Sequence, residues 1–352
     1  MFERLKEYLS LDIGVDLGTA NTLVYVKGKG IVVNEPSVVA INQKTGQVVA
    51  VGKDANKMVG RTPGHVVAVR PLVDGVISNF EATEEMLAHF IRKALETVPK
   101  KLLGPRVVVG IPSGITNVEK RAVRDAARNA GAREVHLIEE PMAGAIGTRL
   151  PVNEPVGSMV IDIGGGTTDV AVISLGGIVS SKNLRIAGDK LNDDIVNYVR
   201  DEFKILIGEK TAENIKLTLG SAVELDDSLE MKVRGRDLVT GLPREITLTD
   251  TDIREAIAPS VHLIMDAVKE VLEVTPPEVM ADVMNRGLVL LGGGALIQNL
   301  SDLLSEELKV PVYIAEDPLT CVVRGAGFVL EDLGKFRNVL IAGDDELPPS
   351  RR

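Results

Sequence analysis

The chain is poor in residue types on which many small or secreted folds depend. Tryptophan is absent, aromatic residues make up 3% of the 352 positions, and Cys321 is the single cysteine. One cysteine excludes an internal disulfide framework and is typical of proteins in a reducing cytoplasm. With so few rings, the core has to be built from Val, Ile, Leu and Ala. The 45% hydrophobic content is ample to bury a core, and the length of 352 residues suggests two or more domains.

The sequence also lacks an excess of basic over acidic residues, and it lacks long apolar runs. Fifty acidic residues against forty basic ones give a net charge of −10. Because nucleic acids are held largely by Lys and Arg, the composition predicts no nucleic-acid partner. No segment approaches the roughly 18 apolar residues of a membrane-spanning helix, and the N-terminus lacks the apolar core of a signal peptide. We therefore expect a soluble, cytoplasmic protein, which can still contact a membrane.

What the chain does contain is an alternation of β-branched runs with amphipathic helical patterns. The expected strands are Ile13–Asp16, Thr22–Val26, Val38–Ile41, Val48–Val51, Arg106–Ile111, Met159–Ile163, Val170–Ser174 and Gly287–Leu291. The expected helices are Glu81–Val98, Asn117–Ala130, Lys190–Phe203, Thr211–Leu219, Thr251–Glu273 and Asn299–Glu307. This order predicts an α/β fold with largely parallel sheets and some hairpins.

An internal duplication is the most informative pattern. A strand, an Asp at its end, a Gly/Thr turn and a second strand occur at Ile13–Val24 and again at Val160–Val172. Two such units predict two related lobes that face each other across a cleft, with one turn on each wall. The Pro- and Gly-containing stretch Leu150–Gly157 is the natural joint between them.

Each of the two turns is suited to hold a phosphate. Small residues let backbone N–H groups converge on an anion. Carboxylates beside phosphates would repel them, so Asp16 and Asp162 indicate a cation between, and Mg²⁺ held through water fits. The alternative for either Asp alone is a turn cap. The candidate phosphate-binding residues are Gly18, Thr19, Ala20 and Asn21 in the first turn and Gly164, Gly165, Gly166 and Thr167 in the second.

A third glycine cluster, Gly292, Gly293, Gly294 and Ala295, follows a strand and precedes a helix. Such a connection allows close approach of a ligand, here the adenosine of a nucleotide. By itself it is a weak signal, and its spacing is not that of the dinucleotide-binding fingerprint.

Two phosphate turns followed by an adenosine turn resemble the superfamily of actin, sugar kinases and heat-shock ATPases, and further motifs resemble the MreB family of bacterial actins. The resemblance covers about residues 10–335. It is carried by Asp16–Thr22, Gly28–Ser37, Arg70–Ile77, Ile138–Met142, Asp162–Thr167, Gly208–Glu213, Thr240–Pro243, Thr275–Glu278 and Leu291–Ala295.

The resemblance implies an actin-like ATPase fold, with two ribonuclease H-like lobes divided into four subdomains around a nucleotide cleft. The first lobe would comprise 11–150 plus 321–342, with a small subdomain at about 34–75. The second would comprise 151–320, with a small subdomain at about 190–250. Residues 343–352 are expected to form a disordered tail.

The resemblance also assigns roles to residues. It implies that Glu213, Asn214, Ile215 and Lys216 contact the ribose and adenine side, and the spacing of three puts Glu213 and Lys216 on one helix face. Glu140, supported by Glu139, would orient the water that attacks ATP. Pro141 is expected to keep Glu140 outside the helical region, with an ordinary carboxyl pKa near about 4.3. The alternative is a plain Glu-Glu-Pro helix start.

The chain departs from the family pattern at two positions. Gly144 stands where Ala is usual, and Asp169 where Glu is more frequent. Since Gly lowers helix stability by up to about 1 kcal/mol, Gly144 puts the rate of hydrolysis in question.

The resemblance further implies a slow ATPase that forms paired protofilaments on the inner face of the cytoplasmic membrane and works with membrane proteins of cell-wall elongation. Within residues 1–10, Phe2, Leu5 and Leu9 fall on one helical stripe, as in an interfacial helix. Leu102 and Leu103 are a second candidate membrane contact.

Three other readings stay open. A small-molecule kinase of the superfamily would need an acceptor pocket, for which no dedicated segment is evident. A chaperone ATPase would need a peptide-binding domain beyond the last motif. A plasmid-segregating actin would have no need of the apolar stripe in residues 1–10.

Overall fold

The computed structural model describes residues 11–98 and 103–342. Within that part of the chain, no helix has the length and apolar character needed to cross a bilayer.

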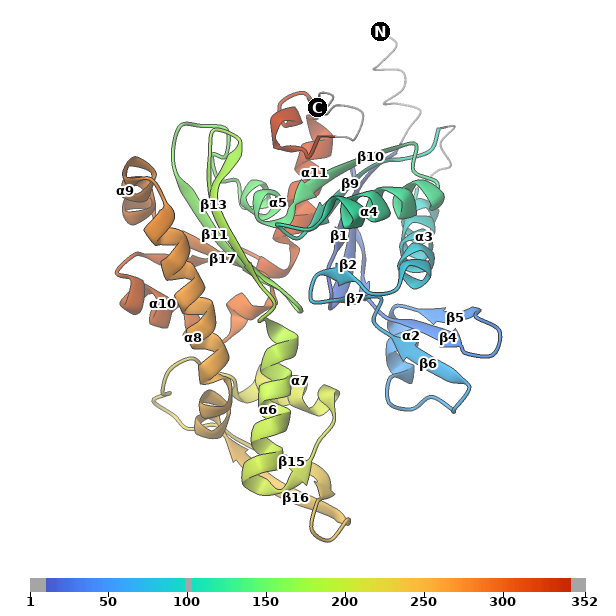
Figure 1. The fold of residues 1–352 in the computed structure, drawn as a ribbon, viewed down its shortest axis with the longest axis vertical. Coiled ribbons are helices and arrows are strands. Elements are labelled where there is room, and N and C mark those ends of the chain that lie inside the picture. The colour runs from blue at the N-terminus through green and yellow to red at the C-terminus, as the bar shows by residue number, and fades with distance from the viewer. Residues whose placement is uncertain (1–10, 99–102, 343–352) are drawn as a thin grey trace, which may run out of the picture.

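Two five-stranded sheets of the same design form the body of the molecule (Figure 1). In each, three antiparallel strands are continued by two parallel ones. The first sheet has the order β10 (Glu134–Glu139), β9 (Arg106–Ile111), β1 (Asp12–Leu17), β2 (Asn21–Val26) and β3 (Gly30–Pro36). The second has the order β13 (Gly177–Leu184), β12 (Thr168–Ser174), β11 (Ser158–Ile163), β17 (Leu288–Leu291) and β18 (Val312–Ile314). The repeated order confirms the duplication, and we call the parts carrying β1–β10 and β11–β18 the first and second lobes.

The central strands are buried because helices cover both faces of each sheet. Every residue of β11 is buried, and β1 is buried except for Asp16, which is partly exposed. Strands covered on both faces have nearly continuous apolar sequences, and this explains why the β-branched runs located them.

Two short helices, α5 (Glu140–Gly147) and α11 (Cys321–Glu331), pack between the two sheets (Figure 1). Glycines let their backbones touch: a Cβ on Gly147 would lie 1.9 Å from the carbonyl oxygen of Cys321, and one on Gly325 would lie 1.8 Å from that of Ala143. Cys321 itself is fully buried, and burial raises the pKa of its thiol. The two lobes therefore share one core at their joint.

Other helices cover the outer faces of the sheets. Thr116 and Thr249 each form a capping box that fixes the start of a helix, the first with Glu119 and the second with Asp252. The helices of the first lobe are α3 (Phe80–Glu96) and α4 (Asn117–Asn129). Those of the second are α6 (Gly188–Phe203), α8 (Asp250–Val274), α9 (Pro277–Arg286) and α10 (Leu300–Leu308).

A smaller sheet extends from each lobe (Figure 1). In the first lobe it has the order β5 (Val48–Val51), β4 (Val39–Asn42) and β6 (Val66–Val69), and α2 (Lys53–Met58) packs on it. In the second it has the order β14 (Ile205–Leu206), β15 (Glu230–Asp237) and β16 (Pro243–Thr249), next to α7 (Glu209–Leu219). A two-stranded ribbon is formed by β7 (Leu72–Val73) and β8 (Val76–Ile77), and short 3₁₀ turns lie at Gly293–Leu296, Pro318–Thr320 and Arg337–Val339.

Candidate functional site

A cavity of about 530 Å³ lies between the lobes and collects residues from all three glycine turns. Its volume is that of a small-molecule site. Of the residues expected to bind the nucleotide or act on it, these line the cavity: Asp16, Gly18, Thr19, Ala20, Asn21, Glu140, Asp162, Gly164, Gly165, Gly166, Thr167, Glu213, Lys216, Gly292, Gly293 and Gly294.

The first two glycine turns face each other at close range. A Cβ on Gly165 would lie 2.6 Å from the Cβ of Ala20, and one on Gly166 would lie 2.7 Å from Oγ1 of Thr19. Any larger side chain would push the turns apart. The absence of side chains at 165 and 166 therefore brings the two walls together at this end of the cavity.

A third segment, the turn between β7 and β8, joins the two glycine turns. Gly75 N–H donates to Thr19 Oγ1 at 3.2 Å, and a Cβ on Gly75 would meet Cγ2 of Thr167 at 2.8 Å. Because Thr19 Oγ1 accepts this bond, its hydroxyl hydrogen is free to donate to a ligand. Gly75 lines the cavity but was not among the residues that the sequence indicated.

Acidic side chains gather on one side of the cavity. Burial raises the pKa of Asp16 to about 7, and burial followed by repulsion from Asp16 and Asp169 raises that of Asp162 to about 8. The pKa of Glu140 is raised well above its usual value by burial and by these same carboxylates. Glu140 Oε1 is buried and has no hydrogen-bond partner within residues 11–98 and 103–342. Because buried like charges repel one another, such a set of carboxyl groups is stable only when a cation is bound nearby or when some of the groups are protonated.

The donor set fits Mg²⁺ held mainly through water and phosphate. Within residues 11–98 and 103–342, no group of three or more His, Cys, Asp or Glu side chains is arranged to hold a metal by itself. Mg²⁺ usually keeps several waters and takes one or two carboxylates together with phosphate oxygens. Asp16 and Asp162, which both line the cavity and carry raised pKa values, meet that requirement.

The position of Glu140 corrects two expectations. The helix α5 begins at Glu140, and Glu139 is the extended residue before it, with φ −70° and ψ 136°. Pro141 thus falls in the first helical turn, where its missing N–H costs nothing, and it does not hold Glu140 outside the helix. The expected ordinary pKa of Glu140 is also wrong, because the carboxyl is buried among like charges.

Asp169 does not line the cavity. Its carboxylate accepts hydrogen bonds from the backbone N–H of Ser113 at 3.0 Å and from Asn183 Nδ2 at 2.9 Å. Burial nevertheless raises its pKa to about 6. Through these hydrogen bonds, Asp169 connects the segment that follows β9 in the first lobe to the sheet of the second lobe.

Glu213 and Lys216 form a hydrogen-bonded pair at the other end of the cavity. Lys216 Nζ donates to Glu213 Oε2 at 2.8 Å and to the carbonyl of Gly188 at 2.9 Å. Asn192 Nδ2 donates to the same Glu213 oxygen at 2.7 Å. The pair is thus fixed against the start of α6, whose Asp189 N–H donates to the carbonyl of Gly165.

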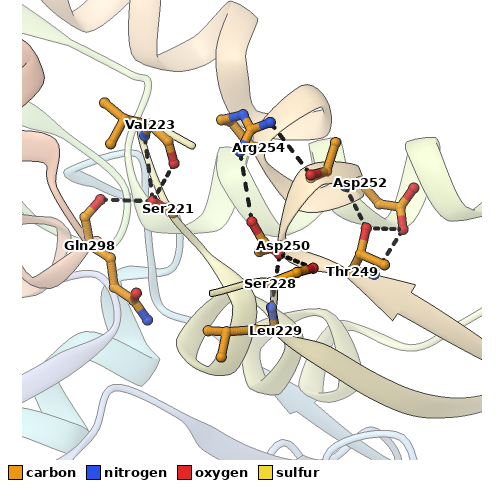
Figure 2. A network of polar contacts seen from close by, with 10 residues as sticks. Ser221, Val223, Ser228, Leu229, Thr249, Asp250, Asp252, Arg254 and Gln298 are labelled. Carbon is orange, nitrogen blue, oxygen red and sulfur yellow. Dashed lines mark hydrogen bonds and ion pairs between the residues drawn. The ribbon is translucent and has the colours of Figure 1, made fainter. Parts of the chain in front are cut away.

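The third glycine turn closes against β11. Gly292 has φ 75°, and a Cβ there would lie 2.4 Å from the carbonyl oxygen of Ile163, so both backbone conformation and space require glycine. Beyond the turn, Gln298 N–H donates to the carbonyl of Gly220, and Ala222 N–H donates to that of Gln298. Figure 2 shows Ser221 and Gln298 side by side, so the ends of two distant segments form this wall of the cavity.

The outer part of the same loop is tied to the start of α8. Asp250 Oδ1 accepts from Ser228 Oγ at 3.0 Å and from Leu229 N–H at 2.9 Å (Figure 2). The segment that forms the wall is therefore anchored at both ends.

Three expected nucleotide contacts lie away from the cavity. Ile215 and Ala295 are fully buried in the core of the second lobe, and Asn214 is exposed. Successive residues of a helix point about 100° apart, so of the four residues 213–216 the first and last share the face toward the cavity.

The cavity also includes residues that sequence reasoning did not identify: Asn34, Gly75, Gly188, Asp189, Gly220, Gln298, Pro318 and Leu319. Gly188 and Asp189 could have been predicted from their position at the start of a helix, because helix N-termini commonly bind anions.

The expected membrane contacts are mostly beyond the described residues. Phe2, Leu5, Leu9 and Leu102 lie outside them. Leu103 is half-buried, whereas exposure was expected.

Comparison with known proteins shows to which family this chain belongs. The family model described as MreB/Mbl protein matches residues 10–338. The chain belongs to this family. It is 55% identical over 335 residues to the cell shape-determining protein MreB of Escherichia coli K12, covering 94% of this chain and 96% of that protein. It is 52% identical over 325 residues to the cell shape-determining protein Mbl of Bacillus subtilis 168, covering 92% and 97%.

Solved structures agree with the family and the fold. The crystal structure of MreB5 of Spiroplasma citri bound to ADP superposes with a TM-score of 0.88 at 41% identity, covering 93% of this chain and 98% of that one. The MamK double helical filament superposes with a TM-score of 0.78 at 22% identity, covering 92% and 99%, and shows the shared fold alone. The chain thus has the actin-like MreB fold.

Proposed function

We propose that this protein binds ATP·Mg²⁺ between its lobes, hydrolyses it slowly, and polymerises into membrane-associated filaments that organise cell-wall elongation and set rod shape. The observation that carries the proposal is the pair of glycine turns that face each other, each with one Asp of the cavity lining beside it. Relatives named for determining cell shape, and one solved with ADP, support it.

The phosphates would lie where the first two glycine turns meet. Backbone N–H groups and the hydroxyls of Thr19 and Thr167 are the donors on this wall. Asp16 and Asp162 would hold the waters of the metal ion. When bound, Mg²⁺ neutralises phosphate charge. The ribose and adenine would lie toward Glu213, Lys216 and the third glycine turn.

Glu140 is the residue we propose for catalysis, with Glu139 in support. Phosphoryl transfer depends mostly on position and on charge neutralisation. Glu140 Oε1 has no hydrogen-bond partner among the residues that the structure describes, so it is available to accept a hydrogen bond from the attacking water. Its raised pKa falls once positive charge reaches the cavity, since repulsion by Asp16 and Asp162 contributes to it.

Self-assembly, membrane contact and partners are further parts of the proposal. A relative of the same fold is known as a double helical filament, which supports a homopolymer, here of paired protofilaments. The N-terminal stripe Phe2, Leu5 and Leu9, together with Leu102, would reach the inner face of the cytoplasmic membrane. Membrane proteins of cell-wall elongation would be recruited there. The net charge of −10 supports the absence of a nucleic-acid partner.

We also propose that the lobes comprise residues 11–150 with 321–342 and residues 151–320, with small subdomains near 34–75 and 190–250. Packing of α11 against β1 and β9, and the hydrogen bond from Ile341 N–H to the carbonyl of Leu137, support the return of the chain to the first lobe.

The decisive test is light scattering together with phosphate release, measured on purified protein with ATP·Mg²⁺ and lipid vesicles. The proposal expects assembly with slow phosphate release and no need for a small-molecule acceptor. Electron microscopy on lipid should show paired protofilaments. ATP consumption that requires an acceptor, without assembly, would instead indicate a kinase.

A further inference from the structure

Arg70 joins one lobe to the other beside the cavity, where one of its partners, Asp189, is a lining residue. It lies between β6 and β7, and its guanidinium pairs with the carboxylate of Glu209, the first residue of α7. A second carboxylate, that of Asp189 in the first turn of α6, lies 3.9 Å from it. One cation of the first lobe thus meets the starts of two helices of the second.

A neighbouring contact connects the same two parts. Lys210, next to Glu209, donates through Nζ to the backbone carbonyl of Asn56 in α2. Residues 209 and 210 of α7 therefore contact the small sheet region of the first lobe at two points. We call the contacts of Arg70 and Lys210 with Glu209, Asp189 and Asn56 the clasp.

The clasp adjoins the cavity itself. Asp189 lines the cavity, and the charge of Arg70 opposes the rise that burial causes in the pKa of Asp189. Burial acts to raise the pKa of Glu213, but hydrogen bonds from Lys216 and Asn192, and to a smaller extent the charge of Arg70, bring it below the usual value. The positive charge of Arg70 therefore acts on carboxylates that lie beside the site of the nucleoside.

From this geometry we infer that Arg70 is a positioning residue whose clasp holds the lobes closed over bound nucleotide and sets the rate of nucleotide release. The inference rests on the proposed function. The side chains of Arg70, Asp189 and Glu209 are 33%, 34% and 46% exposed. Because exposed ion pairs are weak and screened by salt, the clasp can open in each cycle without unfolding either lobe.

The test is the dissociation rate of a fluorescent ATP analogue with Mg²⁺, chased by excess ATP in a stopped-flow instrument. Arg70→Gln and Glu209→Gln should each release the analogue about three- to fivefold faster, the range expected for an exposed pair. The double variant should release it no faster than Arg70→Gln, which already removes both ion pairs of Arg70. The exchanged pair, Arg70→Glu with Glu209→Arg, should restore slow release in part, which a merely structural role would not do.

Arg234→Gln is the matched control. Arg234 and Glu245 form another exposed Arg–Glu pair, with Arg234 more exposed than Arg70, within the hairpin of β15 and β16 and away from the cavity residues. Its loss should leave release unchanged, and thermal melting of all variants should stay near that of the parent.

The outcomes separate the two proposals. If the parent does not bind the analogue at all, the proposed function fails. If it binds, but Arg70→Gln releases at the parent rate or the two single effects add in the double variant, the clasp is refuted.

Discussion

Asp16 and Asp162 occupy the same place in two equivalent strands: each is the fifth residue of its strand, and both line one cavity. Asp16 lies opposite Gly110 in the neighbouring parallel strand, and Asp162 lies opposite Leu291. The repeated sheet therefore delivers one carboxylate from each lobe to a shared site. This relationship gives the first two predictions.

Asp16→Asn and Asp162→Asn should each weaken Mg²⁺-dependent binding of ATP by at least about tenfold, equivalent to about 1.4 kcal/mol. Each variant removes a negative acceptor for the waters of the metal ion. Isothermal titration with ATP, with and without Mg²⁺, measures this. Affinities equal to that of the parent protein in the presence of Mg²⁺ would contradict the assigned role.

The nucleotide-free protein should lose stability as pH rises from 6 to 8.5. Burial raises the pKa of Asp16 to about 7 and that of Asp162 to about 8, from 3.8 for an unburied group. A carboxyl group whose pKa is higher in the folded than in the unfolded state stabilises the folded protein while it is protonated. This stabilisation is complete below the unfolded-state pKa and is lost as the pH rises through the folded-state pKa. Differential scanning calorimetry at several pH values should show a falling Tm, and Asp162→Asn should flatten the fall. A Tm constant over this range in the parent would contradict the raised pKa values.

Glu140→Gln should slow phosphate release by about a hundredfold, within the range typical of a positioned acid or base. Nucleotide affinity should change little, because the proposed bond is to water rather than to ATP. Glu139→Gln is the comparison, with a smaller effect expected. Equal hydrolysis by the parent and Glu140→Gln would exclude Glu140 from catalysis.

Gly325→Ala should destabilise the protein by about 1–3 kcal/mol, the usual cost of overpacking. Its new Cβ would lie 1.8 Å from the carbonyl oxygen of Ala143, and backbone does not move aside easily. Gly144→Ala is the matched variant on α5. Its Cβ would meet Leu291 Cδ1 at 2.3 Å, the end of a flexible side chain, and helix propensity favours Ala by about 1 kcal/mol. Chemical denaturation of both variants should show a clear loss for the first and a small change for the second.

Deletion of residues 2–9 should abolish pelleting with liposomes and leave ATP binding intact. Three apolar side chains contribute roughly 1.5–3 kcal/mol each, so a single subunit binds weakly and a filament binds firmly through many copies. The matched control is the triple variant in which Phe2, Leu5 and Leu9 are each changed to Ser, because it removes the apolar side chains without shortening the chain. Pelleting at the parent level would remove the anchor from the proposal.

The sequence located those parts of the fold in which one physical signal dominates. The paired strands β1 and β11 were visible because strands covered on both faces are apolar throughout, and the turns because an Asp followed by glycines occurs twice. The helices α5 and α11 were not anticipated as amphipathic elements. They are short, contain glycine and are buried on nearly all sides, so they have no polar stripe to reveal them.

The candidate site was predictable in its glycines and acids but not in its supporting residues. Gly75 and Gln298 come to the cavity through tertiary contacts with Thr19 and Gly220, and no local pattern announces them. The sequence also did not predict which face of α7 points toward the cavity, because it indicated all four residues 213–216 as nucleotide contacts. Burial of Ile215 in the core decides which side of the helix faces the ligand.

The burial of Cys321 has a practical consequence for observing this protein at work. A thiol with no exposed surface and a raised pKa reacts slowly with maleimide dyes. A single cysteine introduced on the surface would therefore take the label selectively, with Cys321 left in place. Fluorescent reporters of lobe closure and of subunit exchange can thus be attached without disturbing the packing of α5 against α11.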